Sequence, residues 1–97
     1  MLALLACSPA AAHAHETQVL VKLVAGSDDG ARIAAEASGI AGVPVRYVSA
    51  TSLQWHSLTL QCATEAICDT ALRRLMDAHS VYAAIERDER KRIEPSP

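Results

Sequence analysis

The chain has 97 residues, which is enough for one small domain with one hydrophobic core but too few for two. Apolar residues make up 51% of it, many of them Ala, and Phe is absent, so the core must be built from Val, Ile, Leu and small side chains. The net charge of −2 gives no general attraction for nucleic acid, because the basic residues gather near the C-terminal end instead of forming a broad face.

Residues 1–16 have the features of an export leader. MLALLACSPAAAHAHE is uncharged before Glu16 and rich in Leu and Ala, and it is too short to span a bilayer. The Ala-His-Ala triplet at 12–14 fits a signal cleavage site, whereas Leu-Leu-Ala-Cys at 4–7 fits a lipoprotein box with a lipid on Cys7. No positive residue precedes the apolar run, so we expect a longer signal upstream. Both routes predict an exported protein, periplasmic or secreted, with membrane attachment only through Cys7.

The first half of the domain predicts a strand and then a helix. TQVLVKLVAG at 17–26 is rich in β-branched residues and Leu. Three of its residues share one face: Val19, Val21 and Leu23. Ser27 is the expected N-cap of a helix over 27–42, with Asp28 and Asp29 in the first turn, where carboxylates complement the helix dipole. Gly39 and Gly42 suit the end of that helix.

The second half predicts a hairpin, a helix and a closing strand. VPVRYVSA at 43–50 and WHSLTLQC at 55–62 form the hairpin, with Leu58 and Leu60 facing inward. A helix follows over 63–79, with Thr64 as its expected cap. Its apolar stripe consists of Ile67, Ala71, Leu75 and Ala78. SVYAAIE at 80–86 is the last strand.

This order, βαββαβ, predicts an α+β, ferredoxin-like fold, in which both helices cover one face of a four-stranded antiparallel sheet. The other face is left uncovered, and several of its residues are apolar, which favours a binding partner. In the expected register the uncovered face carries Leu20, Val24, Arg46, Val48, Trp55, Ser57, Thr59, Tyr82, Ala84 and Glu86.

Export to an oxidising compartment favours a disulfide between Cys62 and Cys68. Their spacing suits a bond from the end of a strand to the first turn of the next helix, worth about 2 kcal/mol on the chain-entropy model. The alternative is two small buried thiols. We expect no metal or other cofactor, because the spacing is not Cys-x-x-Cys and the four His residues share no helical ligand register.

Three segments together resemble the propeptide, or inhibitor I9, domain of subtilisin-like serine proteases. They are TQVLVKL as the opening strand, VPVRYVSATSLQWHSLTL as the central hairpin and ALRRLMDAHSVYAAIERD as the closing helix and strand. The last is the most specific, because family members end in a strand of the form V-x-x-I/V-E-x-D. Val81 starts this strand here, and residues 85–88 (IERD) match the end of the pattern. The resemblance covers residues 17–94.

The resemblance implies a domain over residues 17–88 that inhibits a subtilisin-like serine protease and assists its folding. The open sheet face would dock on two helices of the enzyme, with Glu86 and Asp88 at the helix N-termini, where carboxylates are favoured. The tail over 89–97 would then run extended through the active-site cleft. Its contact residues would be Glu89, Arg90, Lys91, Arg92, Ile93 and Glu94. The alternative for this charged tail is a solvated segment without a partner.

The sequence thus predicts a non-catalytic binding protein that is a monomer when free. Its expected partner is a subtilisin-like protease, and the alternative is a small exported lipoprotein or periplasmic domain unrelated to proteases. Enzyme activity has little support, because His56 and His79 have no carboxylate or nucleophile placed beside them in sequence.

Overall fold

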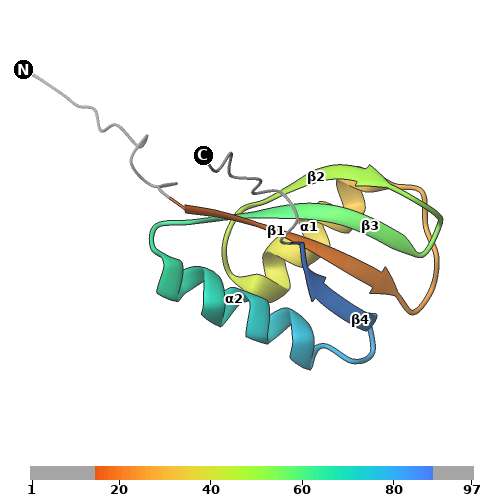
Figure 1. Ribbon diagram of the computed structural model, residues 1–97. Coiled ribbons are helices and arrows are strands. Elements are labelled where there is room, and N and C mark those ends of the chain that lie inside the picture. The colour runs from red at the N-terminus through yellow and green to blue at the C-terminus, as the bar shows by residue number, and fades with distance from the viewer. Residues whose placement is uncertain (1–14, 89–97) are drawn as a thin grey trace, which may run out of the picture.

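A computed structural model describes residues 15–88 and folds them into one antiparallel sheet and two helices (Figure 1). The elements are β1 (His15–Leu23), α1 (Gly30–Ala41), β2 (Val45–Ala50), β3 (Trp55–Cys62), α2 (Glu65–Asp77) and β4 (Tyr82–Arg87). The strand order β2-β3-β1-β4, with every neighbouring pair antiparallel, confirms the ferredoxin-like α+β fold. Cys7, with the rest of the leader before His15, and the tail over 89–97 lie outside the described residues.

Both helices pack on the same side of the sheet, as Figure 1 shows. The central strands β1 and β3 supply the floor of the core, and α1 and α2 cover it with mostly small side chains. The completely buried residues include Val19, Val21, Leu58, Leu60, Ala37 and Leu75. The predicted inward faces of the first and third strands are therefore confirmed. The core contains no Phe, and its largest fully buried side chains are Leu58, Leu60 and Leu75.

The predicted disulfide between Cys62 and Cys68 is present and joins the last residue of β3 to α2. The two Cα atoms are 5.4 Å apart, a normal separation for this bond. Thr64 is the N-cap of α2, as predicted, and its hydroxyl accepts a hydrogen bond from the Ile67 amide. The apolar stripe differs at one position, because Cys68 faces the core while Ile67 is exposed.

Helix α1 begins later than the sequence predicted. Asp29, not Ser27, is its N-cap, and the Asp29 carboxylate accepts a hydrogen bond from the Arg32 amide. Ser27 instead accepts one from the Asp29 amide, so it orders the turn before the helix. The helix ends at Gly42, whose φ of 79° is a left-handed conformation that favours glycine.

Several strand boundaries and the orientation of Tyr82 differ from the predictions. Strand β1 starts at His15, so two residues assigned to the leader pair with β3. Strand β4 starts at Tyr82. A bulge opposite Lys22 and Leu23 shifts the register of β4, so the alternation of its side chains between the two faces is interrupted there. Tyr82 therefore faces the helices and is buried, whereas strict alternation placed it on the uncovered side.

Candidate functional site

The side of the sheet opposite the helices is the candidate partner-binding surface, called the open face below. No helix or strand within residues 15–88 covers it (Figure 1). Strand pairing assigns to it Glu16, Gln18, Leu20, Lys22, Arg46, Ser49, Trp55, Ser57, Thr59, Gln61, Ala84 and Glu86. Val24 and Val48, which the sequence placed here, lie instead in the loop after β1 and at a bulge in β2.

The centre of the open face is made of small polar side chains. Ser57 and Thr59 of β3 are only 9% and 5% exposed, and in the strand register Ser57 lies between Leu20 and Ser49, and Thr59 between Gln18 and Arg46. Gln18 donates a hydrogen bond to the Ser57 hydroxyl across the β1–β3 pair, at 3.3 Å. A partner would therefore meet the more exposed polar side chains around this centre, those of Glu16, Arg46 and Ser49.

One end of the open face carries an exposed ion pair. The Arg46 guanidinium lies 3.7 Å from the Glu16 carboxylate, and both side chains are about half exposed, at 54% and 49%. Exposed pairs of this kind contribute between about 0 and 1 kcal/mol, so a partner can replace them at little cost. Lys22 lies toward the other end, between Trp55 and Ala84 in the strand register.

The two acidic residues singled out by the sequence lie on the β1–β4 edge of this surface. Glu86 is exposed and pairs with Leu20 across the strands, and its side chain forms no ion pair or hydrogen bond within residues 15–88. Asp88 is half-buried, and its amide donates to the Gln18 carbonyl at 2.8 Å, which continues the strand pairing past Arg87. The last described residue is therefore hydrogen-bonded to β1.

Arg87, between the two acidic residues, anchors the end of β4 to the helical layer. Its guanidinium lies 3.0 Å from the Asp69 carboxylate of α2. Since successive strand side chains point to opposite faces, this contact directs Glu86 away from the helices. The sequence predicted Glu86 at this surface, but nothing in the pattern predicted Arg87 as its anchor. The proposed contacts of Glu89, Arg90, Lys91, Arg92, Ile93 and Glu94 lie outside the described residues.

The two histidines that the sequence singled out have different surroundings. His56 is buried beneath the hairpin, where its ring contacts Tyr47, and His79 is exposed after α2. No group of three or more His, Cys, Asp or Glu side chains within residues 15–88 is arranged to hold a metal ion. Neither α1 nor α2 has the length and apolar character needed to cross a membrane.

Comparison with protein-family models, curated proteins and solved structures finds no significant match to this chain.

Proposed function

We propose that this domain is a non-catalytic inhibitor of a subtilisin-like serine protease and assists that protease in folding. The observation that carries the proposal is the position of Glu86, exposed at the edge of an uncovered sheet face on the strand that leads into the charged tail. A second support is the match of residues 85–88 (IERD) to the end of the I9 strand pattern.

The docking surface would be the open face, with Glu86 and Asp88 directed at helix N-termini of the enzyme. A carboxylate there satisfies exposed amide groups and interacts favourably with the helix dipole, each contact contributing about 0.3–1 kcal/mol and more when partly buried. The exposed polar side chains around Ser57 and Thr59, those of Glu16, Arg46 and Ser49, suit contact with another protein's surface because they can donate or accept hydrogen bonds.

Residues 89–94 would supply the inhibitory contacts in the active-site cleft. An extended peptide adds to the enzyme's strand edges through main-chain hydrogen bonds, and alternate side chains enter pockets. In this proposal the open face supplies the affinity and orients the tail. Altering either the open face or the tail alone should therefore weaken inhibition.

A titration of the purified chain against a panel of subtilisin-like proteases, with a peptide substrate as readout, tests the proposal. We expect inhibition by the intact chain and at least about tenfold weaker inhibition by Glu86→Lys, a change of about 1.4 kcal/mol. Deletion of residues 89–97 should weaken inhibition as well. Asp77→Lys makes the same charge change at the exposed end of α2 and should leave inhibition unchanged. Absence of inhibition by the intact chain across the panel would exclude the proposal.

We further propose that the protein is exported. The Cys62–Cys68 disulfide supports this, because such bonds persist in oxidising compartments. Cleavage after Ala14 would begin the mature chain at His15, the first residue of β1, and would leave that strand whole. Mass spectrometry of the mature N-terminus distinguishes this product from a chain with a lipid on Cys7. A chain that keeps Met1 in the producing cell would contradict export by either route.

A further inference from the structure

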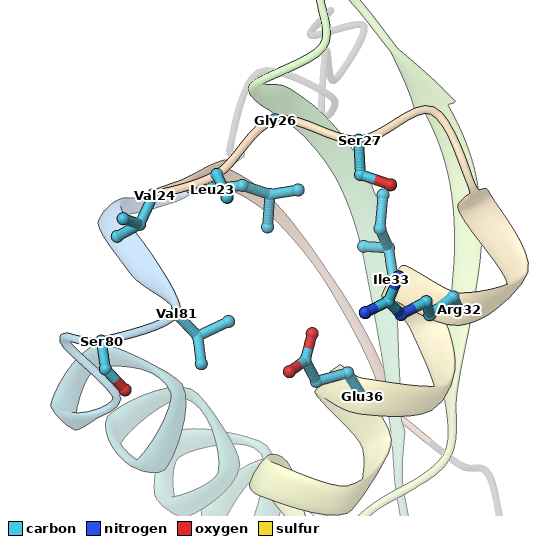
Figure 2. A pocket seen from close by; sticks show the side chains of 10 residues that line it. Leu23, Val24, Gly26, Ser27, Arg32, Ile33, Glu36, Ser80 and Val81 are labelled. Carbon is cyan, nitrogen blue, oxygen red and sulfur yellow. The ribbon is translucent and has the colours of Figure 1, made fainter.

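A hollow lies where the loop after β1, the helix α1 and the turn before β4 meet (Figure 2). Its volume is about 310 Å³, at the lower end of the range for small-molecule sites. It shares no residue with the open face, so its chemistry is independent of the proposed protease contact.

The apolar part of the hollow is formed by Leu23, Ile33 and Val81, whose side chains point into it in Figure 2. Leu23 and Ile33 are core residues and are therefore held in place, with only 5% and 4% of their surface exposed. Because so little of these two side chains is exposed, the apolar surface that binding removes from water is mainly the ligand's own, at about 25 cal/mol for each Å². A rigid aliphatic wall of this kind suits a small branched hydrocarbon group.

The polar part of the hollow carries one positive and one negative side chain. Arg32 and Glu36 lie one helical turn apart on α1, and Figure 2 shows both charged groups directed toward the space between the walls. Neither forms an ion pair with any side chain in residues 15–88. Their order along the helix, with the cation N-terminal to the anion, is the less favourable one for pairing with each other.

We propose that this hollow binds a small zwitterion, an aliphatic α-amino acid. The ligand's carboxylate accepts two hydrogen bonds from the Arg32 guanidinium, and its ammonium group donates to the Glu36 carboxylate. The aliphatic side chain then lies against the apolar wall. Serine hydroxyls at Ser27 and Ser80 line the same hollow and provide further polar contacts at its rim. For so small a ligand in an open site, we expect a dissociation constant on the order of 1 mM.

Titration of the isotope-labelled intact chain with L-leucine, followed by amide NMR, tests the proposal. Saturable shifts should appear at residues 24–27, 33 and 80–81, and not at Ser57 or Thr59 on the open face. Arg32→Gln and Glu36→Gln should each weaken binding at least about tenfold. Arg73→Gln and Glu65→Gln, which remove the same charges from exposed positions on α2, should bind leucine as the unaltered chain does.

Two leucine analogues separate charge recognition from simple apolar contact. N-acetyl-leucine amide lacks both charges and 4-methylpentanoate lacks the ammonium group, so each should bind at least about tenfold more weakly than leucine. Both pocket variants are at exposed positions, and unchanged amide spectra away from the hollow will show that they are folded. The proposal is overturned by an absence of saturable shifts, by equal binding of the uncharged analogue, or by unchanged leucine binding in both pocket variants.

Discussion

The Tyr47 hydroxyl lies 3.0 Å from Nδ1 of His56, so a side chain of β2 is hydrogen-bonded to a buried ring of β3. The other ring nitrogen, Nε2, lies 2.8 Å from the Leu53 carbonyl oxygen in the hairpin loop. Because a carbonyl only accepts, Nε2 carries the ring proton and Nδ1 accepts from the tyrosine. With both nitrogens paired and 1% of its surface exposed, His56 joins the hairpin loop to the sheet.

Tyr47→Phe should therefore destabilise the domain. The substitution keeps the aromatic ring but leaves Nδ1 of His56 buried without a donor, which costs about 1–3 kcal/mol. Urea denaturation, comparing the variant with the unaltered chain at neutral pH, measures the loss. Equal unfolding midpoints would show that the hydroxyl contributes nothing to stability.

Tyr82→Phe should have the opposite effect at neutral pH. The Tyr82 hydroxyl is buried and has no hydrogen-bond partner among residues 15–88. Removing it relieves the cost of burying an unpaired polar group and should raise the free energy of unfolding by about 1 kcal/mol. Since Tyr47→Phe removes the same atom from a paired phenol, the two variants are matched controls for each other. A loss of stability in Tyr82→Phe would contradict this assignment.

Stability should fall in strongly alkaline solution because of the same residue. Burial, together with the nearby Glu36 carboxylate, raises the pKa of Tyr82 from 10.0 to about 12. The folded state thus holds the phenolic proton more tightly than the unfolded chain. The resulting stabilisation is complete below pH 10 and is lost as the pH rises to about 12, by at most about 3 kcal/mol. The free energy of unfolding, measured by urea denaturation between pH 10 and pH 12, should decrease for the unaltered chain. The decrease should be smaller for Tyr82→Phe.

Two glycines of the first helical segment should respond to Ala in opposite directions. Gly42 has a φ of 79°, so Gly42→Ala strains the backbone at the end of α1 and should cost about 1 kcal/mol. Gly39 lies inside α1, and a Cβ there meets nothing within 4 Å. Gly39→Ala should therefore stabilise the domain by about 0.5–1 kcal/mol. Thermal unfolding of both variants measures the contrast, and shifts of the same sign would be inconsistent with it.

The Cys62–Cys68 disulfide should contribute about 2 kcal/mol to the free energy of unfolding, because it limits the freedom of the unfolded chain. Both cysteines are 1% exposed, so reductant must be added to the unfolded protein. Refolding with and without reductant, followed by urea titration, gives the difference. The double variant Cys62→Ala/Cys68→Ala controls for other effects of the reductant and should show no response to it.

Residue patterns predicted much of the fold because the apolar spacing, the helix cap and the cysteine spacing all indicate the same order of strands and helices. Alternating apolar residues indicated β1 and β3, and the cap at Thr64 together with the spacing of Cys62 and Cys68 indicated how α2 follows β3. These features depend on neighbours in the chain, which a single sequence displays directly.

Features that depend on contacts between distant segments were not predicted. The bulge that turns Tyr82 toward the helices arises from the register of β4 on β1, which no local pattern encodes. The Arg87–Asp69 contact likewise joins β4 to α2. Arg32 and Glu36 carried a usable signal, opposite charges at helical spacing, but only the fold shows that they face a hollow. The pairing of His56 with Tyr47 was not predicted, because it depends on the register of the hairpin.

The most direct test of partner binding is an NMR footprint of the labelled chain with a catalytically inactive subtilisin-like protease. We predict shifts or broadening across the open face, at Leu20, Thr59 and Glu86, while the outward sides of α1 and α2 remain unaffected. A footprint confined to the helices, or no change at any residue with a protease that the chain inhibits, would contradict docking through the open face.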